Sequence, residues 1–248
     1  MKAMILAAGL GTRLRPLTDD RPKALVEIDG RTLLEMMLTR LRSVGVSEVI
    51  INVHHFADMI VGYLKTNDNF GMLIEVSRED ALLDTGGGLK KAAPFFLEGG
   101  GGPEPFLLHN VDVLSTIDLG QMLRAHEERD ALATLAVQRR ETSRRLLFDE
   151  QLQLCGRRAG REGLLQLIRR VERPEELAFC GIHVISHRFL RMMTEEGVFS
   201  ILTPYLRLAA QGEKLVGYRA DEYYWRDLGK PDQVRQAEQD LQNKVVRQ

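Results

Sequence analysis

The sequence predicts an α/β protein in which a mostly parallel β-sheet lies between two layers of helices. Short runs of β-branched and aliphatic residues alternate with segments in which leucine and methionine recur at helical spacing. Strands that alternate with helices pair in parallel, because each crossover helix returns the chain to the same edge of the sheet. Glycine-rich and polar segments follow several of the predicted strands, which is where such sheets bind ligands.

The first half of the chain, to about residue 138, supplies most of these elements. Lys2–Ala7 is a short apolar run that ends before glycine, which indicates a buried strand. Apolar residues recur at helical spacing through 33–41, and Gly45 marks the end of that helix. The triple glycine Gly86–Gly88 is expected to precede a short helix that begins at Leu89. Further strands are predicted at 48–53, 73–77, 106–109 and 133–137, and further helices at 57–65 and 119–129.

The second half of the chain alternates less clearly. Residues 139–163 are arginine-rich and poorly periodic, which predicts a hairpin or an excursion from the sheet. Strand-like sequence resumes after the glycine-rich segment 98–105, so that segment is interpreted as a surface loop and not as a linker. A single domain that spans residues 1–248 is therefore expected. Strands are predicted at 178–185 and 215–219, and helices at 201–211 and from 231 onward.

Composition excludes several classes of partner. The formal net charge of the 248 residues is −1, so no overall field attracts nucleic acid or an anionic membrane. The arginines of residues 139–170 are interleaved with acidic residues and few aromatics, which is typical of a solvated surface. Cys155 and Cys180 lack the spacing of a disulfide framework or a zinc site. No signal peptide and no apolar run near the ~20 residues of a membrane span are present, so a cytoplasmic location is expected.

The segment Leu6–Leu25 follows the first predicted strand and is rich in glycine and cations. Glycine lets backbone N–H groups point at an anion, so such a turn often holds phosphate. A Walker A motif is absent, and the fingerprint of a nicotinamide enzyme fails because Leu14 replaces its third glycine. Two interpretations remain from the residues alone. One is a loop that wraps a triphosphate with Arg13 and Lys23, and the other is a structural turn with solvated arginines.

Taken whole, this segment resembles the signature of the sugar-phosphate nucleotidyltransferases, or nucleotide-sugar pyrophosphorylases, which reads LAAGxGTRLxPLT followed by PKxL. Four later segments are similar to further motifs of that family, and the chain length resembles that of its compact members, such as N-acetylmuramate 1-phosphate uridylyltransferases and mannose-1-phosphate guanylyltransferases. The signature is matched by Gly9, Gly11, Thr12, Arg13, Leu14, Pro16, Leu17, Thr18, Pro22, Lys23 and Leu25. The later segments are Asp84–Gly88 (base and ribose), Asn110–Asp112 (metal), Phe179–Val184 (sugar) and the tryptophan–aspartate motif Trp225–Gly229.

The resemblance implies a Rossmann-like three-layer αβα sandwich with a mostly parallel central mixed sheet. It implies a nucleotide-binding part at about 1–138 and a sugar-phosphate-binding part at about 139–248. The implied reaction condenses a nucleoside triphosphate with a sugar 1-phosphate to give a nucleotide-sugar and pyrophosphate, with Mg²⁺ as cofactor. The implied use of the product is cell-envelope polysaccharide synthesis, and a monomer or a small homo-oligomer is expected.

The resemblance also implies roles for individual residues. Arg13 and Lys23 are the implied catalytic residues, Arg13 at the departing phosphates and Lys23 at the α-phosphate. Asp112 and Asp227 are the implied metal ligands. Nucleotide binding is assigned to Leu6, Ala7, Ala8, Gly9, Gly11, Thr12, Arg13, Lys23, Asp84, Thr85, Gly86 and Gly87, and substrate binding to Asn110 and Gly181.

Physical chemistry is consistent with these roles. The acceptor is a phosphate monoester with a second pKa near ~6, so its oxygen attacks without a general base. Catalysis then depends on positioning and charge neutralisation. A phosphocholine cytidylyltransferase-like enzyme and a non-catalytic sugar-nucleotide sensor are kept as alternatives. The full set of leaving-group and metal residues favours an enzyme.

Some residues depart from the family pattern or have simpler interpretations. Val111 stands where the family usually has glycine, and its side chain is expected to face either the nucleotide or the core. Asp84 stands where compact relatives commonly have glutamate. Asp227 would otherwise cap the helix predicted from residue 231. His109 and His183 are interpreted as residues at the edge of the core.

Overall fold

A computed structural model describes residues 1–98, 104–159 and 163–246, so part of the 98–105 segment lies outside the described residues. Ten strands form one mixed sheet in the order β11-β10-β9-β12-β6-β1-β4-β5, and β8 joins both β12 and β13. The sheet strands are β1 (Lys2–Leu6), β4 (Glu48–Val53), β5 (Leu73–Arg78), β6 (Phe106–Asn110), β8 (Ala133–Gln138), β9 (Arg145–Phe148), β10 (Leu154–Ala159), β11 (Leu164–Leu167), β12 (Glu175–Ile185) and β13 (Leu215–Arg219).

The part of the sheet that carries the N-terminal loop is parallel. β1 pairs in parallel with both β4 and β6, and β4 pairs in parallel with β5. The carboxyl ends of these four strands therefore lie along one edge of the sheet. β12 pairs antiparallel with β6 and β8, and its first residues pair antiparallel with β9. The excursion predicted for residues 139–163 is the start of an antiparallel β9–β10–β11 meander, of which residues 160–162 lie outside the described part.

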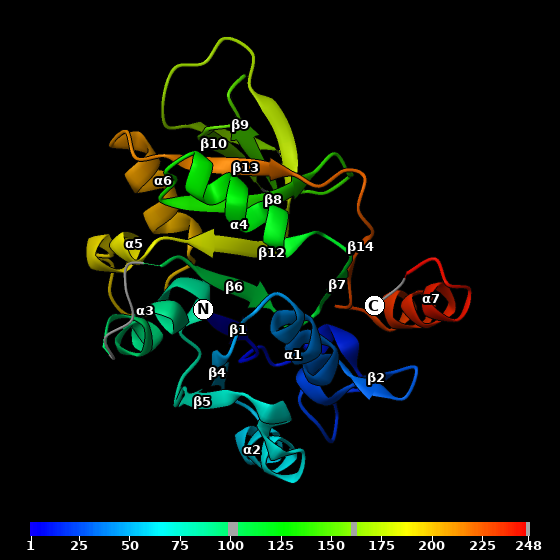
Figure 1. Cartoon of the computed structure of the whole chain (residues 1–248). Coiled ribbons are helices and arrows are strands. Elements are labelled where there is room, and N and C mark those ends of the chain that lie inside the picture. Colours follow the sequence, from blue (N-terminus) through cyan, green and yellow to red (C-terminus); the bar gives the residue numbers. More distant parts are fainter. Residues whose placement is uncertain (99–103, 160–162, 247–248) are drawn as a thin grey trace.

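Helices cover both faces of the sheet, as predicted (Figure 1). One hydrophobic cluster holds buried residues of α1, α2, α4 and α7, and a second holds those of α3, α5 and α6. Side-chain caps begin two of these helices: Thr32 accepts the Glu35 N–H and Asp118 accepts the Gln121 N–H. The helices are α1 (Leu33–Ser43), α2 (Ala57–Thr66), α3 (Asp84–Leu97), α4 (Leu119–Glu128), α5 (His187–Met192), α6 (Leu202–Ala210) and α7 (Pro231–Gln242).

Two small strand pairs and three 3₁₀ turns lie outside the main sheet. The pair β7 (Val113–Ser115) and β14 (Trp225–Asp227) is antiparallel and lies beside the end of β6 (Figure 1). The other pair is β2 (Glu27–Ile28) with β3 (Arg31–Thr32). The 3₁₀ turns are η1 (Thr12–Leu14), η2 (Lys23–Leu25) and η3 (Asp68–Gly71). The sequence analysis missed both pairs, because their strands are too short to show periodicity.

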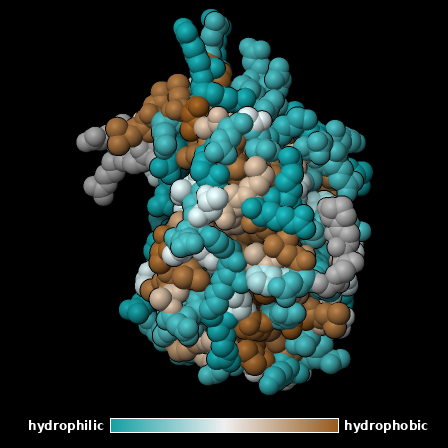
Figure 2. All heavy atoms as spheres, turned by 90° about the vertical axis from the view of Figure 1, so that its left-hand side faces the viewer, coloured by the Kyte–Doolittle hydropathy of each residue, from teal (hydrophilic) through white to brown (hydrophobic). Residues whose placement is uncertain are grey.

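No helix in the described part of the chain is long and apolar enough to cross a membrane. On the face that Figure 2 presents, apolar and polar side chains are interspersed. The edge strand β11 is the most apolar exposed element, with Leu164, Leu165 and Leu167 at its surface.

The helix predicted to start at Leu89 starts earlier, at Asp84, so the triple glycine lies in its first turns. A Cβ on Gly86 would lie 2.5 Å from the Phe199 ring, and one on Gly87 would lie 2.5 Å from the Gly197 carbonyl oxygen. The glycines therefore allow the helix to pack directly against residues 197–199. Tertiary packing outweighs the poor helix propensity of glycine at this point.

Candidate active site

A cavity of about 490 Å³ lies at the carboxyl ends of the four parallel strands. Its position is the one that open α/β sheets use for ligands. Among the residues assigned from the sequence, the N-terminal loop, the start of α3 and the end of β6 meet in its wall. The lining residues are Leu6, Ala7, Ala8, Gly9, Leu10, Gly11, Thr12, Arg13, Lys23, Asn52, Glu79, Leu82, Asp84, Thr85, Asn110, Val111, Asp112, Val198 and Gly229.

The loop after β1 is held in place by its own residues. Gly11 has a φ of 67°, a left-handed conformation that favours glycine. The buried Thr18 hydroxyl donates to the Gly11 carbonyl oxygen at 2.9 Å, and the Leu14 N–H donates to the same oxygen at 2.8 Å. A Cβ on Gly11 would lie 3.0 Å from Thr18 Cγ2. The glycine and the threonine of the signature thus close this turn together.

Two buried polar residues that the sequence analysis missed connect the two glycine segments. Asn52 Oδ1 accepts the Ala7 N–H at 2.8 Å, and Asn52 Nδ2 donates to Glu79 Oε1 at 2.7 Å. The other oxygen of Glu79 accepts the Leu83 N–H at 3.0 Å. A Cβ on Gly88 would lie 2.8 Å from both side chains. The only sequence signal for this network is a polar residue at the end of each of two predicted strands.

The start of α3 reaches the cavity with two of its four assigned residues. Asp84 and Thr85 line the wall, and the Asp84 carboxylate accepts the Thr85 N–H at 2.6 Å. Gly86 and Gly87 are not among the lining residues. Their N–H groups donate to the Phe199 carbonyl oxygen at 2.9 and 3.1 Å, so these two amides are already used within the fold.

At the acidic end of the cavity, the segment after β6 lies next to the end of β14. Asp112 lies two residues after the end of β6, and its carboxylate forms an ion pair with Lys23, whose side chain is only 10% exposed. Asp227 ends β14, whose pairing with β7 places it opposite Val113. The Leu228 N–H donates to the Asp112 carbonyl oxygen at 2.8 Å, which ties the two acidic segments together.

Asp227 carries a buried oxygen, Oδ1, without a hydrogen-bond partner. A Cβ on Gly229 would lie 2.7 Å from this oxygen and 3.0 Å from Arg13 Nη2, so the Arg13 guanidinium and the Asp227 carboxylate meet at Gly229. Buried polar atoms are normally satisfied, so an unpartnered carboxylate oxygen beside the cavity marks a place for a ligand. No group of three or more His, Cys, Asp or Glu side chains within the described residues is arranged for a metal ion.

The two residues assigned to substrate binding contact each other. Gly181 has a φ of 75°, and a Cβ there would lie 2.8 Å from Asn110 Nδ2. Asn110 lines the cavity, whereas Gly181 and Asp227 are not among its lining residues. Trp225 Nε1 donates to the Cys180 carbonyl oxygen at 2.7 Å, which fixes β14 against this part of β12.

Val111, the departure from the family pattern, faces the core. Its side chain is 4% exposed and packs in the cluster that includes α1. It lines the main cavity and also a second cavity of about 310 Å³ between α1 and β7, so it forms part of the wall between them. Of the two expected orientations, the structure shows the core-facing one.

Burial perturbs three titratable groups on the strands β6 and β12. His109 and His183 are fully buried, and burial lowers the pKa of each to about 3. Burial raises the pKa of the free Cys180 thiol to about 12. These groups are therefore neutral at pH 7. The histidines lie inside the core and not at its edge as predicted.

Comparison with known proteins decides the family. The sequence profile described as "Nucleotidyl transferase" matches residues 2–146, which is more than half of the chain. The chain belongs to this nucleotidyl transferase family. The resemblance to the sugar-phosphate nucleotidyltransferases is thereby confirmed, and the protein is an enzyme of the transferase class. A non-catalytic sensor is therefore not retained as an interpretation.

Two characterised relatives illustrate the similarity to this nucleotidyl transferase. An N-acetylmuramate alpha-1-phosphate uridylyltransferase of Caulobacter vibrioides is 33% identical over 245 residues, which is 95% of either chain. The mannose-1-phosphate guanylyltransferase 1 of Arabidopsis thaliana is 36% identical over 138 residues, which is 55% of this chain and 38% of that protein.

Solved structures of the same fold cover the whole nucleotidyl transferase chain. A putative glucose-1-phosphate thymidylyltransferase from Bacillus anthracis has a TM-score of 0.78 at 16% identity and covers 100% of this chain and 97% of its own. A UDP-glucose pyrophosphorylase complexed with UDP-glucose has a TM-score of 0.75 at 18% identity, with 98% of each chain covered. The predicted Rossmann-like sandwich is confirmed.

Proposed function

We propose that this nucleotidyl transferase condenses a nucleoside triphosphate with a sugar 1-phosphate, giving a nucleotide-sugar and pyrophosphate in a Mg²⁺-dependent reaction. The observation that carries the proposal is the arrangement of Arg13, Lys23 and Asp112 in the cavity wall, with the Asp227 carboxylate next to Arg13 at the lining residue Gly229. Cations and carboxylates gathered at a strand-end cavity suit the meeting of two polyanions.

In this proposal the acceptor supplies its own nucleophile. An oxygen of the sugar 1-phosphate attacks the α-phosphorus of the nucleotide, a new P–O bond forms, and the bond to the β-phosphate breaks. The leaving pyrophosphate carries the electron pair. Backbone N–H groups of the loop at Gly9–Thr12 bind the triphosphate, Arg13 binds its β- and γ-phosphates, and Lys23 neutralises charge at the α-phosphate.

The carboxylates of Asp112 and Asp227 would hold the magnesium ion. The unpartnered Oδ1 of Asp227 and the oxygens of Asp112 are the hard, anionic donors that this ion prefers. Two protein carboxylates suffice, because Mg²⁺ commonly keeps water and substrate phosphate oxygens as its other ligands. When bound, the ion would neutralise charge on the reacting phosphates.

The relatives suggest which substrates to test first. The Caulobacter vibrioides relative is named for N-acetylmuramate 1-phosphate and uridylyl transfer, and it aligns with almost the whole chain. We therefore propose UTP and N-acetylmuramate 1-phosphate as the leading pair, whose product would serve cell-envelope polysaccharide synthesis. GTP with mannose 1-phosphate is the second pair, because mannose-1-phosphate guanylyltransferases match about half of the chain. Residues 1–138 would bind the nucleotide and 139–248 the acceptor, within one domain.

The proposal is tested by pyrophosphate release with purified protein and Mg²⁺. Each nucleoside triphosphate is paired with N-acetylmuramate, mannose and glucose 1-phosphates, and CTP is also paired with phosphocholine. Release with one sugar 1-phosphate pair, lost on addition of EDTA and restored by excess Mg²⁺, is the expected result. Release with phosphocholine alone would establish the cytidylyltransferase alternative, and turnover that survives EDTA would contradict the magnesium proposal.

A further inference from the structure

Arg140 is a half-buried cation that neither the family signature nor the cavity lining includes. Its Cζ lies 3.8 Å from the centroid of the Trp225 ring, and its Nη2 donates to the Phe179 carbonyl oxygen at 2.6 Å. Its Nε is buried and has no hydrogen-bond partner. Within the described residues, Arg140 takes part in no ion pair.

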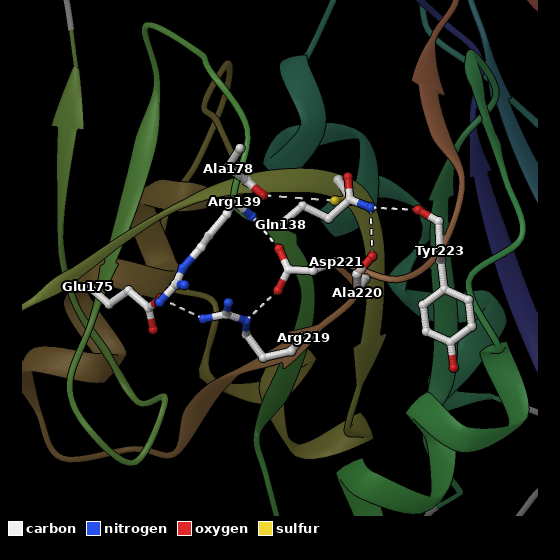
Figure 3. Close-up of polar contacts among 9 residues, drawn as sticks. Gln138, Arg139, Glu175, Ala178, Arg219, Ala220, Asp221 and Tyr223 are labelled. Atoms are coloured by element: carbon white, nitrogen blue, oxygen red, sulfur yellow. Dashed lines mark hydrogen bonds and ion pairs between the residues drawn. The ribbon is translucent and has the colours of Figure 1, made fainter.

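The Gln138 side chain and the backbone N–H of Arg139 hold the chain next to Arg140 in place. Gln138 Nε2 donates to the carbonyl oxygens of Ala220 and Tyr223, which fixes the end of β8 (Figure 3). The Arg139 N–H donates to Asp221 Oδ1 at 2.6 Å, and the Arg139 guanidinium turns outward to Glu175. Arg219 completes the network by binding both of those carboxylates. Arg139 is thus an exposed cation paired with a carboxylate, and the next residue, Arg140, is a half-buried cation without a carboxylate partner.

The Trp225 stacking places Arg140 beside the acidic end of the cavity. Trp225 and Asp227 are two residues apart on β14, so their side chains lie on the same face of that strand. Burial lowers the pKa of Arg140 below its usual value, while the Cys180 side chain and, to a smaller extent, the Asp227 carboxylate favour the charged form. This face therefore holds a desolvated guanidinium N–H and an unpartnered carboxylate oxygen. Such a guanidinium is stabilised by a dianionic ligand that it binds through two N–H groups.

The position separates Arg140 from the cations of the nucleotide loop. Arg13 and Lys23 belong to the loop after β1 and line the cavity. Arg140 follows the end of β8 and contacts the part of β12 that contains Gly181. We propose that Arg140, stacked on Trp225, binds the non-attacking phosphate oxygens of the sugar 1-phosphate acceptor. This inference rests on the proposed function. Arg173, in a Glu-Arg-Pro segment, is another cation of this part of the chain, but it is exposed.

The test compares the Michaelis constants of the wild type and four variants for both substrates. R140A should raise the KM for the sugar 1-phosphate by about 10- to 100-fold, the loss expected for a bidentate charged contact, and should leave the KM for the nucleotide within about twofold. R140K keeps the charge without the planar guanidinium, so its KM for the sugar 1-phosphate should lie between those of R140A and the wild type. R139A, the matched control at the neighbouring paired arginine, and R173A should leave the acceptor KM unchanged. Thermal unfolding of each variant monitors folding.

Each outcome decides the inference. An unchanged acceptor KM in a folded R140A or R140K overturns it, as does an equal rise in both KM values or a rise in R173A instead. If the wild type is inactive with every substrate pair, the proposed function fails, and calorimetric titration of wild type and R140A with glucose 1-phosphate still tests Arg140. Weaker binding to R140A supports an anion site, and equal binding overturns it.

Discussion

At the scale of the residue, the site depends on charges that are incompletely paired within the fold. Lys23 and Asp112 neutralise each other, while Asp227 retains an oxygen without a partner. The family resemblance pointed to Arg13 and Lys23 in the signature and to Asp112 in a later segment, and all three lie in the cavity wall. Asn52 and Glu79 were not predictable, since their role arises only when two distant strand ends meet. Arg140 was hidden for the same reason, as its stacking partner lies 85 residues later.

Replacing either member of the ion pair should abolish turnover. K23A and D112N are each expected to lower kcat/KM by at least about 100-fold, because each removes a charge that acts on the reacting phosphates. R15A is the control, since Arg15 lies in the same loop with a side chain that is 68% exposed. Initial rates of pyrophosphate release, with circular dichroism to confirm folding, measure the effect. Wild-type rates in a folded K23A or D112N would contradict the assigned roles.

At the scale of the element, the predicted strands and most of the predicted helices are confirmed, with shifts at their ends. The run 215–219 matches β13, and the helix predicted from residue 231 is α7. The predicted start of α3 was wrong. A triple glycine normally indicates a loop, and it forms helix here because tertiary packing requires residues without side chains. Only the structure shows that Gly86 and Gly87 admit close contact with residues 197–199.

Two glycine-to-alanine substitutions test this explanation of α3. G87A should destabilise the protein by about 1–3 kcal/mol, since a Cβ would lie 2.5 Å from a backbone oxygen and force the helix away. G62A, in the middle of α2, has open space and should stabilise the protein by about 0.5–1 kcal/mol through helix propensity and unfolded-state entropy. Urea unfolding of both variants measures the free energies. Equal effects of the two substitutions would contradict the packing argument.

At the scale of the whole molecule, the fold brings three chain regions to one cavity. The N-terminal loop, the end of β6 and the late β14 segment meet there because β1 and β6 are adjacent and β7 pairs with β14. The sequence predicted the layers and the parallel sheet, since these follow from element order. It predicted β12 only from residue 178. The first residues of β12, which pair with β9 and join the parallel part to the meander, have no local signal.

The buried histidines predict how stability depends on pH. His109, His126 and His183 have folded pKa values of about 3, 4 and 3, below the unfolded value near 6.5, because burial disfavours the charged form. The unfolded chain therefore binds more protons between these values, so stability is complete above pH 6.5 and falls as the pH drops toward 4. Each histidine should lower the free energy of unfolding at pH 5 by about 2 kcal/mol relative to neutral pH.

Thermal unfolding between pH 7 and 4.5 measures this dependence. H183Q is the comparison variant, because His183 hydrogen-bonds only through Nδ1, to Tyr205, and leaves Nε2 unpaired. It should have a shallower pH dependence than the wild type. Acidic groups with lowered pKa values, such as Glu195 and Asp240, lose their contribution only below this window. A flat stability profile between pH 7 and 5 would contradict the neutral, buried state of these histidines.

The most direct test of the central claim follows the oxygen atoms of the acceptor. Sugar 1-phosphate labelled with ¹⁸O in its phosphate group is incubated with the matching nucleoside triphosphate and Mg²⁺, and the products are analysed by mass spectrometry. The proposed attack by a phosphate oxygen predicts that all of the label stays in the nucleotide-sugar and that the pyrophosphate contains none. Label released as inorganic phosphate, or a product without the sugar phosphate, would contradict the account.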